Sequence, residues 1–480
     1  MKRTPAWLAS VAALALSGCV VGPDYHRPVE PEGAAQPWRS AEPTQAAVAE
    51  PPDAWWRLYD DARLDDYVGE ALTANRDLAA AEDNLVAARS ILSAARAGRY
   101  PVTATTAAAT RGRDPVTDEL LGALGRKNET VWKYDDLLDV TYELDLFGHV
   151  RRSTEAARAD SQAVEAVRDG VKVTVAAETT RAYVSICVLG EQIAVAQHSL
   201  AVVSRERDIT ARRQAAGDAS AFDLVRAEIL VSQVRASVPP LQGQRRAALF
   251  ELAALLGKTP ARAPDEALAC TAPPQLQAPI PVGDGAGLLR RRPDVREAER
   301  NLAAASARVG VATAELYPRI TLGGFYGGAS GALHGLTEER GLAWGVGPSV
   351  NWAFPNQAGP RARVRASKAN AAAALDRFDS VILRALRETE QSLSTYGAEL
   401  ERHQALGDAR GQAHRAFDLA RGQVAAGAAS PLDLLTSEQQ MVAADAAAAA
   451  SDAALLQNQV TVFKALGGGW RSAPVRPGER

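Results

Sequence analysis

The sequence predicts a mainly helical chain with a smaller β portion, built from one structural unit that occurs twice. Three observations predict this class. Long stretches carry apolar residues at heptad spacing, shorter segments alternate between apolar and polar residues, and the two halves of the chain match each other in order. Each half is therefore expected to contain a long antiparallel coiled-coil hairpin and a pair of strands.

Composition narrows the classes of function. The 54 basic and 57 acidic residues nearly balance, which argues against nucleic acid as a partner. The 6 histidines and 3 cysteines show no ligand spacing, so neither a metal site nor a disulfide scaffold is expected. No H-E-x-x-H, G-x-S-x-G, P-loop or EF-hand pattern occurs. The chain is thus expected not to be an enzyme and to need no cofactor.

The amino terminus predicts an exported protein. Lys2 and Arg3 precede an apolar stretch at 6–16, and small residues follow, so residues 1–18 are expected to be a signal peptide. Leu16-Ser17-Gly18-Cys19 resembles a bacterial lipobox, in which the cysteine thiol receives diacylglycerol. Cys19 is therefore the predicted lipidation site. The alternative is an ordinary signal peptide with a chance cysteine. Residues 19–54 are rich in Pro and Ala and are expected to form an extended tether.

Ordered matches between the halves define the repeat. Gly217-Asp218-Ala219-Ser220 and the residues after it match Gly427-Ala428-Ala429-Ser430 at an offset of 210. Upstream, Tyr100-Pro101 matches Tyr317-Pro318 at an offset of 217. The expected organisation is a first repeat at 55–270, a linker at 271–292, a second repeat at 293–470 and a tail at 471–480.

Long helices are expected at about 148–216 and about 360–426, each on the order of 100 Å if unbroken. In the first, apolar residues are spaced 3, 4, 3, 4, 3, which is typical of a coiled-coil seam; they are Ile186, Leu189, Ile193, Ala196, Leu200 and Val203. The helix after each tip completes a hairpin. Pro239-Pro240 predicts a kink or a break in the first of these. Shorter helices, at 62–99 and 293–316, are expected to end at the Tyr-Pro pairs.

Strict alternation predicts the strands. Leu138, Val140, Tyr142, Leu144 and Leu146 alternate with acids and a threonine, and a second alternating run extends from Trp344 to Phe354. Weaker partner segments lie at 102–110 and 320–330. Strands of about ten residues are long enough to cross a bilayer when tilted. Four strands would leave open edges in lipid, so three copies supplying twelve are expected. The alternative is a half-buried sheet of a soluble protein.

Taken in order, several motifs resemble the outer membrane efflux protein family, in its lipoprotein branch of TolC-like, NodT-type outer membrane factors. They are the lipobox, Gly22-Pro23-Asp24-Tyr25-His26-Arg27-Pro28, Trp55-Trp56, the duplicated Tyr-Pro, Asp145-Leu146-Phe147-Gly148 and the two Gly-x-x-Ser tips. The resemblance implies a homotrimer with a twelve-stranded outer membrane barrel and an α-helical periplasmic cylinder. It also implies a periplasmic adaptor protein, an inner membrane transporter of the RND class and outer membrane lipid as partners.

The resemblance places a gate at the periplasmic tips. In the family, hydrogen bonds and ion pairs hold the helices closed there. The candidate gate residues are Leu432, Asp433, Thr436, Asp218 and Asp223, and Thr436 stands where relatives often carry an acid. Candidate adaptor-docking residues are Arg212, Arg213, Gly217, Ser220, Arg421, Gly427 and Ser430. The arginines are expected to bridge to the tip aspartates or to contact the adaptor. The alternative for each polar residue is a helix N-cap or a surface charge.

Asp139, Glu143 and Asp145 are candidate pore-lining residues, since an acid facing lipid near the middle of a bilayer costs roughly 2 kcal/mol or somewhat less. The alternative is a solvated strand face without a role in selectivity. The expected function is a passive export duct for drugs or other small toxic compounds, opened at its tips by the adaptor. A duct for type I protein secretion and a non-conducting, lipid-anchored periplasmic scaffold are the other two hypotheses.

Overall fold

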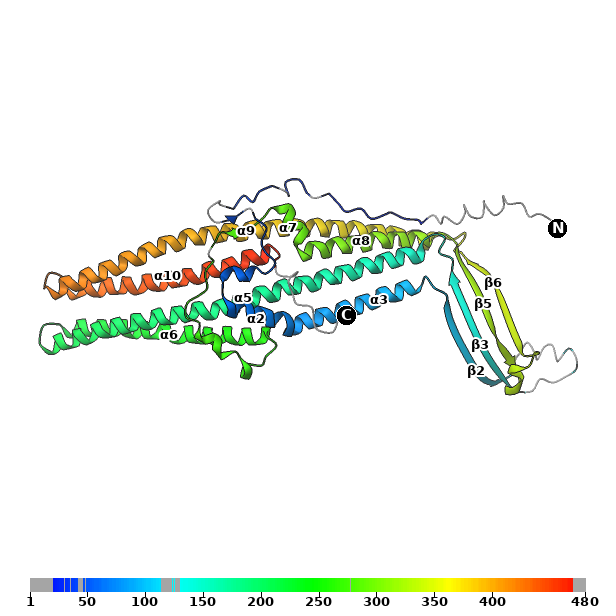
Figure 1. The fold of residues 1–480 in the computed structure, drawn as a ribbon, viewed down its shortest axis with the longest axis horizontal. Helices are drawn as coiled ribbons and strands as arrows, with labels where there is room; N and C mark the ends of the chain where they lie inside the picture. The colour runs from blue at the N-terminus through cyan, green and yellow to red at the C-terminus, as the bar shows by residue number, and fades with distance from the viewer. Residues whose placement is uncertain are drawn as a thin grey trace. The chain divides into compact units, whose positions relative to one another are not determined.

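The computed structural model describes residues 20–29, 31–34, 36–41, 46–47, 49–113, 123, 125, 130–276 and 278–468. The predicted signal peptide, Cys19 and the tail at 471–480 lie outside these residues. The same order of elements occurs twice (Figure 1). The first half contains α2 (Ala62–Ala74), α3 (Arg76–Ala97), β2 (Val102–Gly112), β3 (Val131–Glu143), α5 (His149–Ala215) and α6 (Ala221–Leu255). The second contains α8 (Pro293–Ala314), β5 (Arg319–Ser330), β6 (Leu342–Asn351), α9 (Ala358–Ala425) and α10 (Pro431–Ala465).

Two compact units make up the chain, and each draws on both halves. The first comprises Met1–Pro28, Leu85–Val164 and Ala298–Phe378, and it includes the four long strands. The second comprises Val29–Asn84, Glu165–Glu297 and Asp379–Arg480, and it includes both helical hairpin turns. The repeat in sequence is therefore not a division into two separate bodies, because each half contributes strands to one unit and a hairpin to the other.

Three of the six predicted seam residues of α5 are buried, namely Ile186, Ile193 and Val203, whereas Leu189, Ala196 and Leu200 are partly exposed. Ile186 is fully buried, Val203 is 2% exposed, and Val231 and Val234 of α6 are 4% and 5% exposed. One 18-residue window of α5 is apolar enough to cross a membrane by length and composition, but core helices pass the same test and 39% of that window is buried.

A kink or a break was expected at Pro239-Pro240; the break does not occur, because α6 is continuous from Ala221 to Leu255 with both prolines inside it. Each proline removes one intrahelical hydrogen bond, to the carbonyl four residues before it. Both prolines are exposed, so these carbonyls face water that can hydrate them.

An aromatic core holds the second unit together. Trp55, in the 3-10 helix η1 (Trp55–Tyr59), is fully buried and stacks on Phe463 of α10 with ring centroids 4.6 Å apart. Trp56 is 4% exposed, and its indole N–H donates to Asp65 at 2.8 Å. The Trp55-Trp56 motif therefore anchors the segment that precedes α2 against the end of the second hairpin.

Segments expected to be connectors are also packed. The short strand β1 (Ala46–Ala47) pairs in parallel with β4 (Ile280–Pro281), and the indole of Trp38 donates to the carbonyl of Val282. The helix α7 (Gly285–Arg291) follows, with Leu288 buried. The described part of the tether from Val29 onward and the 271–292 segment therefore belong to the folded body of the second unit.

The four long strands form one antiparallel sheet with the order β2-β3-β5-β6. Its register places Leu138, Tyr326 and Trp344 in one row, with side chains exposed at 41%, 59% and 70%. The next row in the register belongs to the opposite face and contains Asp139 and Phe325. The predicted alternation is therefore confirmed from Leu138 to Glu143 and from Trp344 to Asn351, whereas the ends of both runs, at 144–146 and 352–354, lie past the strands. In one chain, β2 and β6 are the edges.

A disulfide joins Cys187 of α5 to Cys270, with the two Cα atoms 4.8 Å apart. The wide separation of these cysteines in sequence had argued against a disulfide framework, and the structure corrects this for the one pair. Folding brings them together because Arg245 of α6 donates to the carbonyls of Cys270, Leu268 and Ile186. The bond fixes the segment after α6 to the buried side of α5.

We expect Cys187→Ala combined with Cys270→Ala to lower the free energy of unfolding by about 2–5 kcal/mol, because it removes a cross-link that restricts the unfolded chain. Thermal unfolding followed by circular dichroism measures this. In the unreduced, denatured parent protein, alkylation should leave both thiols unlabelled, and labelling of either would contradict the disulfide.

Candidate functional site at the helical tips

Each helical hairpin turns at a glycine with a left-handed backbone. Gly217 follows α5 with φ +84°, and Gly427 follows α9 with φ +72°. No atom lies within 4 Å of where a Cβ would stand at either position. Glycine is needed there for its backbone conformation, since other residues pay about 1–2 kcal/mol in the left-handed region.

Matching capping boxes begin α6 and α10. The hydroxyl of Ser220 accepts from the amide of Asp223 at 3.1 Å, and Asp223 accepts from the Ser220 amide at 3.1 Å. Ser430 and Asp433 make the same pair of bonds at 3.3 and 3.0 Å. Hydrogen bonds from the serines hold the pKa of both aspartates below its ordinary value. Both aspartates thus act as helix caps, the alternative that the sequence left open.

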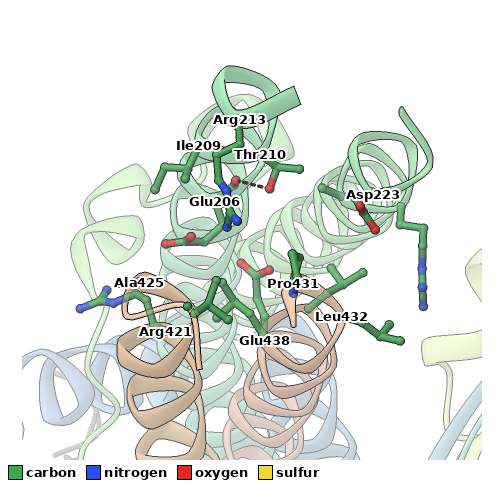
Figure 2. A pocket seen from close by; sticks show the side chains of 16 residues that line it. Glu206, Ile209, Thr210, Arg213, Asp223, Arg421, Ala425, Pro431, Leu432 and Glu438 are labelled. Atoms are coloured by element: carbon green, nitrogen blue, oxygen red, sulfur yellow. Dashed lines mark hydrogen bonds between the residues drawn. The ribbon is translucent and has the colours of Figure 1, made fainter. Parts of the chain in front are cut away.

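A groove of about 500 Å³ lies between the two tips, lined from α5, α6, α9 and α10 (Figure 2). Among the predicted gate and docking residues, it brings together Arg213, Asp223, Arg421, Gly427 and Leu432. The others are at the turns or on neighbouring faces and do not line it: Arg212, Gly217, Asp218, Ser220, Ser430, Asp433 and Thr436.

Leu432 and Thr436 lie on one face of α10, as their spacing predicts. The Thr436 hydroxyl donates to the Leu432 carbonyl at 2.8 Å, and the Leu432 side chain is 44% exposed. Leu432 therefore presents an apolar side chain at the tip, whereas the hydroxyl of Thr436 bonds within its own helix.

The expected arginine bridges are not formed in this chain. Across the described ranges, no ion pair links Arg212, Arg213 or Arg421 to Asp218, Asp223 or Asp433. The Arg421 guanidinium lies instead over the ring of Phe417, 5.8 Å from its centroid. The aspartates that cap helices already receive hydrogen bonds, so the arginines are left at the surface.

Two buried acids of the groove were missed by sequence reasoning. Glu206 of α5 is 8% exposed and Glu438 of α10 is 3% exposed, and both line the groove. A strict seam would continue from Val203 to Arg207, so Glu206 was not expected to be buried. The signal for Glu438 was its helical spacing with buried Met441, three residues further along α10.

The sheet places two of the three candidate pore-lining acids together. Asp139 and Glu143 lie on the face opposite Leu138, in rows with Phe325 and Thr321 respectively. Glu143 also meets two basic groups, with its carboxylate 3.3 Å from Nδ1 of His149 and 3.7 Å from Nε of Arg319.

Asp145 lies past the end of β3, contrary to the expected strand that extended to it. Its carboxylate accepts the amides of Val150 and Arg151, each at 2.8 Å, at the start of α5. The unpaired amides of the first helical turn explain this position. Asp145 is therefore a helix cap rather than a member of the strand face.

Arg152 of α5 holds the chain that follows Cys19. Its side chain is 4% exposed and pairs with Asp24 at 2.8 Å and Glu155 at 2.9 Å. It also donates to the carbonyls of Val21 and Gly22. At Gly22 a Cβ would stand 2.4 Å from Cα of Gly310, so only glycine fits. The Gly22-Pro23-Asp24-Tyr25 motif thus docks the start of the tether.

Comparison with known proteins places the chain. The family model described as Outer membrane efflux protein matches residues 67–258 and 287–468. Nodulation protein T of Rhizobium leguminosarum bv. viciae is 30% identical over 478 residues, covering 97% of this chain and 94% of that protein. The toluene efflux pump outer membrane protein TtgF of Pseudomonas putida is 30% identical over 488 residues, covering 98% of each. The solved structure of the outer-membrane channel OprN matches with a TM-score of 0.87 and 34% identity, covering 94% of this chain and 100% of that one.

The chain belongs to the outer membrane efflux protein family. The predictions of family, fold class, efflux function and outer membrane location are confirmed by this membership. Proteins of this family are transport ducts, so the class of protein is a channel and not an enzyme family.

We expect Gly427→Ala to loosen the second tip, because alanine pays about 1–2 kcal/mol in the left-handed backbone. Hydrogen exchange of the amides around residue 427 should accelerate by roughly 5–30-fold. Gly411→Ala is the matched control: it lies inside α9 with open space around it and should leave exchange at the tip unchanged. Equal effects of the two variants would contradict the backbone argument.

Proposed function

We propose that the protein is the outer membrane component of a tripartite efflux pump, a passive duct for drugs or other small toxic compounds. The sheet carries this proposal. One face exposes Leu138, Tyr326 and Trp344, while the opposite face carries Asp139 and Glu143. Such a sheet suits a wall with lipid on one side and a wet lumen on the other.

The proposed assembly is a homotrimer. The edge strands β2 and β6 each have one side without a partner strand in a single chain. Backbone groups inside a bilayer need hydrogen-bond partners, which favours closure by pairing between copies. Three copies supply twelve strands, so that β6 of one copy can pair with β2 of the next.

The proposed partners are a periplasmic adaptor and an inner membrane transporter of the RND class, which supplies the energy. The adaptor is proposed to dock at the tips and open them. Exposed arginines and open turns support this role, since Arg212, Arg421, Gly217 and Gly427 are all exposed. The proposed gate comprises Leu432, Asp433, Thr436, Asp218 and Asp223, with the capping boxes holding the two turns in shape.

Asp139 and Glu143 are proposed to line the lumen. Asp139 is the one of the two without a described ion pair, whereas Glu143 meets His149 and Arg319. A ring of Asp139 from three copies would favour cations. The pore-lining role is not proposed for Asp145, because its two oxygens accept amides of α5.

Cys19 is proposed to carry the lipid anchor. Val20, the next residue in the sequence, lies against Gly148 at the start of α5. The Val21 amide donates to the carbonyl of Phe147, which follows the end of β3. This docking supports an anchor close to the sheet, at the level where a lipid chain enters a membrane.

We expect planar bilayers containing the purified protein to show small or rare openings, and the double variant Leu432→Ala, Asp433→Ala to show larger ones. The variant removes apolar contact at the tip and a cap worth about 1 kcal/mol. Leu383→Ala changes an exposed leucine on a different helix, α9, and should behave as the parent protein does. A folded trimer that conducts alike in all three forms would exclude these gate residues. A monomer that does not insert would support the scaffold hypothesis instead.

We expect Cys19→Ala to abolish incorporation of labelled palmitate in cells, because it removes the thiol that accepts diacylglycerol. Arg152→Ala should retain the label, since the contacts of Arg152 with residues 21–24 act after lipidation. Membrane fractionation and gel autoradiography make the comparison. Labelling of Cys19→Ala equal to that of the parent protein would exclude Cys19 as the acceptor.

A further inference from the structure

Glu206 and Glu438 are the buried acids of the tip groove, and their burial is unusual. Their side chains come from α5 and α10, two helices of different hairpins (Figure 2). With 8% and 3% of their surface exposed, both carboxyls have lost most of their hydration. Within the part of the chain that the structure describes, Oε1 of Glu438 has no hydrogen-bond partner. An ionised carboxylate in such a position carries a desolvation cost that nothing offsets.

The same helix contains another buried acid, which, unlike Oε1 of Glu438, has basic side chains as partners. Asp445 of α10 is 4% exposed and lies seven residues, about two helical turns, further along the helix from Glu438. Its carboxylate accepts from Nε of Arg410 at 2.9 Å and lies 2.8 Å from Nε2 of His414. The hairpin thus gives Asp445 an arginine and a histidine as partners, whereas no basic side chain among the described residues pairs with Glu438.

Charged groups from all four helices surround the groove. These groups are Glu206, Arg205 and Arg213 of α5, Asp223 and Arg226 of α6, Arg421 of α9 and Asp433 of α10. Arg226 lies over Phe222 and Arg421 over Phe417, and neither forms an ion pair with Glu438. Burial raises the pKa of Glu206, and the charges of Arg421 and Arg205 oppose this. Burial, assisted by the negative charge of Glu206, raises the pKa of Glu438 to about 7.

We propose that Glu206 and Glu438 form a proton-binding site that ties α5 to α10 at the tips and makes tip closure depend on pH. With the proton bound, one carboxyl is neutral and has an O–H to donate in the groove. When the proton leaves to water, two carboxylates share a buried space, repel each other and favour a solvated, looser tip. The described residues hold no group of three metal ligands, so a proton rather than a metal ion suits the pair.

The sign of the dependence follows from the pKa of Glu438. In a loosened, hydrated tip the carboxyl returns to its ordinary pKa of 4.5, whereas in the closed tip the pKa is about 7. Below pH 4.5 both states hold the proton, and closure is strongest. As pH rises toward about 7, only the closed tip keeps the proton, so closure weakens by about tenfold per pH unit at most. Above that pH the loss is complete.

The test is the pH profile of channel opening in planar bilayers between pH 5 and pH 7.5, for the parent protein, Glu438→Gln, Glu206→Gln and Glu401→Gln. The parent protein should open roughly 100-fold more readily at the upper end at most. Glu438→Gln mimics the neutral acid and should stay closed with a flat profile. Glu206→Gln removes the like charge and should shift the profile to lower pH. Glu401→Gln changes an exposed acid of α9 and should match the parent protein.

A parent-like profile in Glu438→Gln would overturn the proton site. This interpretation of conductance rests on the proposed channel function, so a second measurement separates the two. Hydrogen-exchange rates of the amides at 206–213 and 431–438 are measured at each pH in the parent protein and in Glu438→Gln. The ratio of the parent rate to the variant rate is then compared across pH, because the intrinsic exchange rates cancel in it. A ratio that rises with pH supports the site even where no form conducts, and a constant ratio overturns it. Absence of conductance in a folded trimer would count against the channel alone.

Discussion

Burial along narrow seams is the interaction on which the long helices depend. Helices of 67 and 68 residues cannot be held by local propensity alone, because most helical stability in proteins comes from covering an apolar face. Buried apolar side chains form a large cluster around Trp55 and Phe463, where the hairpins end. Toward the tips it falls to a small cluster of Val203, Leu230, Val231 and Val234. The tips are therefore the part of each hairpin where polar groups have the greatest influence on packing.

The sheet obeys a different constraint, that of pairing backbone groups. Its two faces follow from the alternation of side chains, but its edge strands, β2 and β6, each lack a partner strand on one side within one chain. The helical part can fold by burying side chains of its own sequence, whereas the strands reach full pairing only when other copies are added. This difference explains why one polypeptide contains a self-sufficient core in one unit and an incomplete sheet in the other.

Most of the fold could be predicted from the sequence, because its periods are long and its duplication is ordered. The helix ends at Ala215 and Ala425 were predicted to within one residue, since glycine turns mark them. Three features escaped. The heptad spacing continues from Val203 to Arg207, whereas the buried position is Glu206. The Cys187–Cys270 pairing depends on how the segment after α6 returns to α5. Asp145 continues an alternating pattern, but helix capping determines where its side chain binds.

The disulfide has a consequence for the order of events in biogenesis. Pairing of Cys187 with Cys270 needs an oxidising compartment, so the segment after α6 is joined to α5 only once the chain has been exported. Three cysteines allow three different pairs, and Cys19 is the odd one. A thioether to lipid at Cys19 would remove that thiol from exchange before oxidation begins. Acylation would then serve as a protecting group for correct cross-linking, in addition to its role as an anchor.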